Sequence, residues 1–321
     1  MTLETDGVSI ITFGPVPSRR LGRSLGINNI PPKNCSYSCV YCQVGRTMVK
    51  QTTAQTFYRP EEIENAVMTK VKAALAAGEE IDYLTFVPDG EPTLDLHLGE
   101  VIDRLRPLGI KIAVISNASL IWREQVQHIL SKADWVSLKI DSVDEATWKL
   151  INRPHESLQL PVILRGIKCF AQHYKGELVT ETMLVEGIND NHESVASVAE
   201  FLFQLKPHKA YLAIPTRPPA ETNIRAPDEK VIIRAYRLMK EKCIDVEYLI
   251  DYEDDAFALT DGAEQDLLAI TAVHPMREQA VQKLLSKAGE DWDLIQRLLA
   301  EKKLKRVEYT GQHFYVRCLD H

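Results

Sequence analysis

The sequence predicts an α/β fold built on a parallel sheet, with a smaller helical unit near the C-terminus. From about residue 60, short apolar runs alternate with amphipathic helical segments, which is the pattern of βαβ units. Hydrophobic residues form 45% of the 321 positions and charged residues 26%, as in ordinary globular proteins. No apolar run approaches the roughly 18 residues needed to cross a bilayer. A chain of this length predicts about two domains.

The first helix is predicted near 60–78 and is followed by a strand at 81–87. Pro60 suits the first helical turn and Gly78 the position just past the last turn. Apolar residues recur every four positions and mark a buried face, at Ile63, Val67, Val71 and Leu75. Further strands are predicted at 111–116, 135–140, 178–185, 210–215 and 246–250. Helices are predicted near 96–108, 120–131 and 158–173, from Asp190 with a capping box, and from Pro227.

The pattern changes after about residue 256. Helical segments are predicted near 262–271, 276–287 and 291–303, followed by a hairpin of 304–309 and 313–319. Three helices and a hairpin are typical of a winged helix-turn-helix, so we expect two domains, 1–255 and 256–321. Residues from 261 on hold nine basic and ten acidic side chains, a weak electrostatic footprint for DNA.

A small basic patch in this unit leaves two alternatives open, contact with RNA or docking to a protein surface. The patch and the aromatic residues beside it are Lys302, Lys303, Lys305, Arg306, Tyr309, Phe314 and Tyr315. The whole chain carries a net charge of −7, which excludes a general nucleic-acid-coating role.

Three of the six cysteines are grouped, with the spacing C-x3-C-x2-C at Cys35, Cys39 and Cys42. The N-terminus has no basic region of a signal peptide, so we expect a cytoplasmic protein in which disulfides rarely persist. Thiolates bind iron–sulfur clusters or zinc, and both alternatives stay open at this point. With no fourth cysteine nearby, three thiolates on a four-iron cluster would leave one iron free for a small molecule. The other cysteines, Cys169, Cys243 and Cys318, are predicted to be small buried hydrophobes.

Polar motifs follow three successive predicted strands, where parallel α/β folds place their ligands. Asp89-Gly90-Glu91-Pro92 follows the strand at 81–87, and Ser116-Asn117 ends the next strand. Ser137, Lys139 and Asp141 alternate and so share one face of the third strand. Each motif also has an interpretation without a ligand. The first fits an ordinary turn, Ser116-Asn117 fits a helix N-cap, and Lys139 with Asp141 fits an internal ion pair.

The spacing Cys-x3-Cys-x-aromatic-Cys, with Tyr41 as the aromatic residue, resembles the signature of the radical S-adenosylmethionine (SAM) superfamily. The resemblance covers roughly residues 10–250 and implies a partial (β/α)6 TIM-like barrel. It implies a [4Fe–4S] cluster on the three cysteines and SAM bound to the open iron. Reduction then cleaves SAM to methionine and a 5′-deoxyadenosyl radical, which abstracts hydrogen from a substrate.

The same resemblance implies which residues contact SAM. Gly90, Glu91 and Pro92 correspond to the family's Gly-Glu-Pro motif for the methionine amino group. Ser116 and Asn117 correspond to a polar pair that contacts the ribose and the carboxylate, with Ala118 where glycine is common. Lys139 and Asp141 are further expected contacts to ribose hydroxyls or a carboxylate. No catalytic residue beyond these cofactor contacts is assigned.

Within the superfamily, the arginine-rich lead-in and Cys-Val-Tyr-Cys-Gln-Val-Gly-Arg-Thr resemble uncharacterised iron–sulfur oxidoreductases related to tRNA wyosine-synthesis enzymes. No cysteine precedes Cys35, so the second cluster of the wyosine enzymes is not expected. The expected partners are SAM, an electron donor such as flavodoxin or ferredoxin, and an RNA or peptide substrate. The alternative function is an iron–sulfur redox-sensing regulator that uses the winged helix to bind DNA or a partner.

Overall fold

The structure is a computed structural model, and it describes residues 11–249, 257 and 262–318. Its main feature is one curled sheet whose strands follow one another in chain order. The strands are β1 (Thr12–Ser18), β2 (Gly22–Ile27), β3 (Tyr83–Phe86), β4 (Lys111–Ser116), β5 (Trp135–Lys139), β6 (Glu177–Met183), β7 (Lys209–Ala213) and β8 (Val246–Leu249). Every neighbouring pair from β2 to β8 is parallel. The expected α/β fold and partial TIM-like barrel are therefore confirmed.

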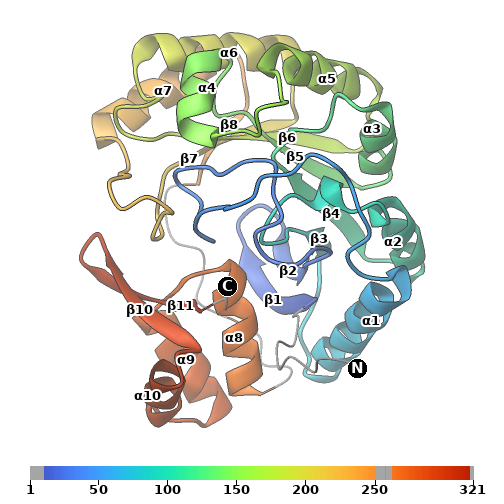
Figure 1. Ribbon diagram of the computed structural model, residues 1–321, viewed down its shortest axis with the longest axis vertical. Coiled ribbons are helices and arrows are strands. Elements are labelled where there is room, and N and C mark those ends of the chain that lie inside the picture. Colours follow the sequence, from blue (N-terminus) through green and yellow to red (C-terminus); the bar gives the residue numbers. More distant parts are fainter. Residues whose placement is uncertain (1–10, 250–256, 258–261, 319–321) are drawn as a thin grey trace.

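Helices cover the outer, convex side of this curved sheet (Figure 1). They are α1 (Pro60–Ala76), α2 (Leu98–Leu105), α3 (Glu124–Leu130), α4 (Glu145–Asn152), α5 (Leu160–His173), α6 (His192–Leu205) and α7 (Glu229–Glu241), with short 3₁₀ turns η1 (Pro92–Leu94) and η2 (Arg106–Leu108). Ile63 and Val67 on α1 are fully buried as expected, whereas Leu75 at its end is exposed. None of the described helices is long and apolar enough to span a membrane.

The main departures from the predicted elements are the antiparallel hairpin of β1 and β2 and the helix α4. The prolines at 15 and 17 argue against a strand, because proline cannot donate to a ladder. β1 accommodates them because it lies at the edge of the sheet. The helix expected from Asp190 begins two residues later, and the capping side chain is that of Asn191, which accepts from the Ser194 N–H at 2.9 Å.

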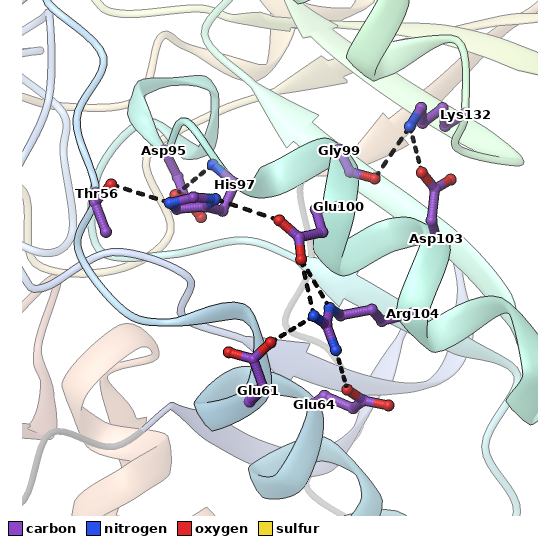
Figure 2. A network of polar contacts seen from close by, with 10 residues as sticks. All are labelled: Thr56, Glu61, Glu64, Asp95, His97, Gly99, Glu100, Asp103, Arg104 and Lys132. Atoms are coloured by element: carbon purple, nitrogen blue, oxygen red, sulfur yellow. Dashed lines mark hydrogen bonds and ion pairs between the residues drawn. The ribbon is translucent and has the colours of Figure 1, made fainter.

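An exposed ion network joins the neighbouring helices α1 and α2 (Figure 2). Arg104 on α2 pairs with Glu61 and with Glu64 of α1, the latter at 3.1 Å, and with Glu100 on its own helix at 2.9 Å. At the N-terminal end of α2, Thr56 contacts the ring of His97 at 3.0 Å. The network therefore links the end of the long β2–α1 loop to the helical layer.

The C-terminal unit has the expected order of three helices and a hairpin. Its elements are α8 (Ala263–Val273), β9 (Met276–Arg277), α9 (Glu278–Ala288), α10 (Asp293–Ala300), β10 (Leu304–Tyr309) and β11 (Gln312–Arg317). β9 pairs with β11, which gives a small three-stranded sheet. The name winged helix stays a prediction, and so does the domain boundary at 255/256, which lies outside the described residues.

Tyr309, Phe314 and Tyr315 are all at most 7% exposed. These rings, which the sequence places beside the basic patch, form part of the unit's own core and of its contact with the barrel. Lys303 in that patch pairs with Glu301 at 2.8 Å and with Glu264 at 3.3 Å. The aromatic rings are therefore not available for stacking on bases in this conformation.

The C-terminal unit packs on the barrel through a buried ion pair and a hydrogen bond. Lys70 of α1 donates to Asp266 of α8 at 2.8 Å, and both side chains are almost fully buried. The Tyr309 hydroxyl donates to the Pro215 carbonyl, beyond the end of β7, at 3.3 Å. In Figure 1 the unit accordingly lies beside β1, at the open edge of the sheet.

Candidate functional site

The three grouped cysteines lie on the loop between β2 and α1, which runs along the carboxyl ends of the strands. The backbone of Val40 donates to the Ile151 carbonyl at 3.0 Å and accepts from the Glu221 N–H at 3.1 Å. Gln51 N–H donates to the Cys35 carbonyl at 3.0 Å. The Val40 contacts fix the cysteine loop against the end of α4 and against the segment that follows β7.

Two asparagine side chains donate to the sulfur atoms of this loop. Asn117 Nδ2 lies 3.4 Å from Cys35 Sγ, and Asn152 Nδ2 lies 3.4 Å from Cys39 Sγ. All three thiols are free and half-buried. Burial raises the pKa of Cys35 and raises the pKa of Cys39 to about 12, so both are neutral without a metal. Binding iron would release their protons, as is usual for thiolate ligands.

Gly90 allows the cysteine loop to touch the end of β3. An added Cβ at this position would lie 1.9 Å from the Asn34 carbonyl oxygen, which no side chain tolerates. The same carbonyl accepts from the Glu91 N–H at 3.0 Å. The glycine of the Asp-Gly-Glu-Pro motif is thus required for contact with the residue next to Cys35, and the following Pro92 starts η1.

The Glu91 carboxylate joins the ends of β3 and β4. It is fully buried and accepts from Ser116 Oγ at 2.8 Å, from the Asn117 N–H at 2.7 Å and from the Thr93 hydroxyl at 2.6 Å. Burial raises the pKa of Glu91, and these donors oppose the rise. The motifs expected at two successive strand ends are therefore one hydrogen-bonded group.

Asn117 continues this group to the cysteine loop, since its amide also donates to Ser36 Oγ at 3.0 Å. The alternative that Ser116-Asn117 caps the next helix is wrong, because α3 begins only at Glu124. Ala118 has a φ of +63°, in the left-handed region that glycine adopts most easily. This conformation explains physically why glycine suits the position.

Tyr41 and Asp141 meet on the other side of the loop. The Tyr41 hydroxyl donates to Asp141, which also accepts from Asn152 Nδ2 at 2.7 Å and from the Met183 N–H at 2.8 Å. Because Asn152 also donates to Cys39, these side chains connect the end of β5 to the second cysteine. Tyr41 and Asp141, two of the predicted cofactor contacts, are therefore hydrogen-bonded to each other and linked to Cys39 through Asn152.

Lys139 pairs with Glu181 of β6, at 2.6 Å, and not with Asp141 as the ion-pair alternative proposed. Glu181 also pairs with Arg20, from the β1–β2 turn, at 2.5 Å. Burial raises the pKa of Glu181, but the nearby charges of Lys139 and Arg20 prevail and lower it to about 2. The Lys139 ammonium lies 4.8 Å from the centre of the Tyr41 ring.

The structure thus connects every predicted site residue, directly or through one neighbour, to the cysteine loop. It also adds Glu181, which the sequence analysis missed, and gives partners to Arg20 of the arginine-rich lead-in and to Asn152. An acidic residue within the apolar strand at 178–185 was the available signal for Glu181. Asn152 belongs to an Asn-Arg-Pro run that resembles the same family group, but the sequence predicted neither α4 nor a side-chain role for Asn152.

The remaining cysteines do not behave as predicted. Cys169 and Cys243 are exposed, and Cys318 is half-buried. Cys169 lies on the outer face of α5, and Cys243 follows α7 in a left-handed turn with a φ of +59°. The expectation of three buried cysteines is therefore wrong.

The residues present fit a four-iron cluster and a polar small molecule. Within the described part of the chain, no three Cys, His, Asp or Glu side chains converge tightly enough for a single metal ion. A [4Fe–4S] cluster does not need that convergence, because each thiolate binds a different iron. Lys33 Nζ and Asp89 Oδ1, among the described residues, are buried beside this loop without hydrogen-bond partners. A buried polar atom without a hydrogen-bond partner calls for an explanation, and a bound ion or polar molecule is one.

Comparisons with known proteins agree with this geometry. The family model described as the radical SAM superfamily matches residues 29–201, a segment that contains the three cysteines and all the expected SAM contacts. A UPF0026 protein of Methanocaldococcus jannaschii is 48% identical over 309 residues, which cover 96% of each chain.

Two solved structures share the fold at low sequence identity. The structure of TYW1 with a lysine–pyruvate adduct bound has a TM-score of 0.53 at 18% identity, over 68% of this chain and 73% of that chain. The structure of Streptococcus suis SuiB bound to SAM has a TM-score of 0.52 at 13% identity, over 70% of this chain and 49% of that chain. The curled sheet, the family match and the connected cysteine loop lead to one conclusion: the chain belongs to the radical SAM superfamily of enzymes, which use a [4Fe–4S] cluster and SAM.

Proposed function

We propose that this chain holds a [4Fe–4S] cluster on Cys35, Cys39 and Cys42, cleaves SAM reductively and abstracts hydrogen from a substrate. When bound, the reduced cluster and SAM supply a 5′-deoxyadenosyl radical, which takes a hydrogen atom and leaves as 5′-deoxyadenosine. One electron from a flavodoxin or ferredoxin in the cytoplasm starts each cleavage. The protein supplies positioning and excludes water.

One observation supports this proposal: the thiols of Cys35 and Cys39 share hydrogen bonds with the motifs at three successive strand ends. Asn117 contacts both Cys35 and the Glu91 carboxylate, so the cluster ligand and the expected methionine contact are held together. Tyr41 and Asn152 join Cys39 to Asp141 in the same way. A site with only a structural metal has no need of this extension along the sheet edge.

Different residues of the chain are proposed to bind different parts of SAM. Glu91 offers a buried carboxylate for an ammonium group, and Ser116 with Asn117 orients it. Lys139 and Asp141 offer charges inside the barrel for ribose hydroxyls or a carboxylate. The ion pair of Lys139 with Glu181 keeps the lysine charged, since the pKa of Lys139 is lowered by burial but raised more by Glu181 and Asp141.

The test is anaerobic reconstitution with iron and sulfide, followed by SAM and dithionite. We expect about four irons per chain and the formation of 5′-deoxyadenosine and methionine. Cys39→Ala should lose both the cluster and the product, whereas the matched control Cys169→Ala, at an exposed cysteine on α5, should keep them. A wild-type protein with a full cluster and no 5′-deoxyadenosine would refute the proposal.

The substrate is proposed to be an RNA or a peptide. Hydrogen abstraction moves a substrate hydrogen to the 5′ carbon of 5′-deoxyadenosine, so the product reports the substrate class. We would incubate the reconstituted enzyme with deuterated RNA or deuterated peptide fractions and measure deuterium in 5′-deoxyadenosine by mass spectrometry. Incorporation from one fraction identifies the class, and incorporation from neither fraction counts against both.

A further inference from the structure

Lys33 is a half-buried charged residue on the cysteine loop, two positions before Cys35, that the proposed function does not use. Its Nζ atom is shielded from solvent and has no hydrogen-bond partner among the described residues. By contrast, Lys70 donates to Asp266 and Lys139 donates to Glu181. An ammonium group without an anion is costly to bury. Lys33 therefore points to a negative group that the protein chain does not provide.

The backbone fixes the direction of the Lys33 side chain. Its φ is +67°, an uncommon conformation for a residue with a side chain. Its N–H donates to the Asp89 carbonyl at 2.9 Å, which ties it to the end of β3. The Lys33 backbone is therefore anchored to the Asp-Gly-Glu-Pro motif, which fixes the point from which its side chain leaves the loop.

The amine lies under the turn that carries Cys42. An added Cβ on Gly45 would be 3.1 Å from Lys33 Nζ, so the two positions are in contact. The Gly45 N–H in turn donates to the Cys42 carbonyl at 3.1 Å. Gly45 has a φ of +92°, which turns the backbone over the lysine. Lys33 is thus packed between β3's end and the third cysteine.

The neighbouring Asp89 does not satisfy the Lys33 ammonium. The Asp89 backbone carbonyl accepts from the Lys33 N–H at 2.9 Å. The two side chains do not hydrogen-bond each other, because Lys33 Nζ and Asp89 Oδ1 are both buried without a hydrogen-bond partner within the described residues. The ammonium group is therefore left for a group that binds beside the cysteine loop.

We propose that Lys33 is a positioning charge for the iron–sulfur cluster, which stabilises the reduced form and so raises the midpoint potential. The inference rests on the proposed function, because it needs a cluster on the three cysteines. The physical reason is that reduction adds one negative charge, and a nearby cation in a low-dielectric site favours the more negative state. Lys33 acts through the cluster and is not assigned contact with substrate.

The test is a redox titration of the reconstituted full-length protein, followed by electron paramagnetic resonance of the reduced cluster. We compare wild type with Lys33→Met, Lys33→Arg and the control Lys50→Met. Lys50 lies on the same loop, but its ammonium already donates to the Pro154 carbonyl at 2.9 Å. We expect a more negative midpoint potential in Lys33→Met, and values close to wild type in Lys33→Arg and Lys50→Met.

Each outcome decides the inference. A wild-type midpoint in fully loaded Lys33→Met overturns it, and so does an equal shift in Lys50→Met, which would show a general effect of charge. If Lys33→Met fails to load iron while Lys33→Arg loads it, the need for a charge at this position supports the inference. A wild-type protein that binds no cluster refutes the proposed function instead, so the two failures are distinguishable.

Discussion

Arg104 and Glu181 each pair with several side chains of opposite charge. Arg104 lies on the helical layer, between α1 and α2, whereas Glu181 lies on β6 inside the barrel. The groups around Arg104 are 28–55% exposed (Figure 2), whereas those around Glu181 are 10–19% exposed. Water replaces any lost partner of Arg104. Loss of Glu181 leaves Arg20 and Lys139 without their carboxylate where water has little access.

The comparison indicates that burial, not the number of contacts, decides how much stability the protein loses when one charged partner is removed. Exposed ion pairs are weak because water screens them and the long side chains lose freedom. A buried pair adds little net stability over an apolar pair, but removing one partner is costly. Glu181 therefore fixes the placement of Lys139 and Arg20, whereas Arg104 contributes only modest cohesion between the helices.

Glu181→Gln should break the buried network and give the largest effect. We expect a loss of about 3–5 kcal/mol in the free energy of unfolding, because the variant keeps the volume but leaves two cations unpaired. Urea denaturation followed by circular dichroism measures this loss. A change below about 1 kcal/mol would contradict the view that burial decides the cost.

Lys70→Met tests the same rule at a place far from the cysteine loop. The variant leaves Asp266 buried without its ammonium partner, so we expect a loss of about 3 kcal/mol. Because this pair joins the barrel to the C-terminal unit, we also expect faster limited proteolysis between the two. Unchanged stability and proteolysis would mean that only the barrel network follows the rule.

At acid pH, wild type should lose the extra free energy of unfolding that it has over Glu181→Gln. The pKa of Glu181 is depressed to about 2 in the folded protein, so its stabilising contribution is present above the unfolded value near 4.5 and lost as the pH falls. Between pH 6 and pH 3, the stability difference between wild type and Glu181→Gln should shrink by about 2 kcal/mol. A difference that is constant over this range would contradict the assigned charge network.

Arg104→Ala should give the smallest effect, despite three carboxylate partners. We expect the melting temperature to change by less than about 2 °C, because the partners remain solvated without it. Differential scanning calorimetry in low and high salt measures this change, and any loss should be smaller in high salt. A large, salt-independent loss would place this network in the same class as Glu181.

The sequence pattern predicted the parallel strands from β3 to β8 because each is a short apolar run between amphipathic helices. It missed β1 because proline argues against a strand, and the edge position that tolerates proline is a property of the assembled sheet. It missed β2 because this strand holds two glycines and no long apolar run. It missed α4 for a similar reason, since the helix is short, with an exposed Leu150 facing solvent. Whether such short segments form a strand or a helix depends on their contacts with residues distant in the sequence.

The candidate site was predicted through motifs, but its connections were not. The resemblance supplied the cysteines, Glu91, Asn117 and Asp141 with expected roles, whereas it assigned no role to Asn152 or Glu181. Their roles depend on which strands lie side by side, and no local pattern encodes that order. The comparisons support the enzyme and give no support to the regulator alternative.

The contact between Gly90 and the Asn34 carbonyl has a consequence for assembly. Because the glycine lets the loop backbone rest directly on the end of β3, the loop cannot move without disturbing the hydrogen bonds of Glu91 to β4. Iron binding and sheet-edge order are then thermodynamically linked. Any free energy gained by loading the cysteines also stabilises the strand ends, by mass action on the folded state. Iron binding at the cysteine loop would therefore also order the Glu91, Ser116 and Asn117 side chains at the strand ends.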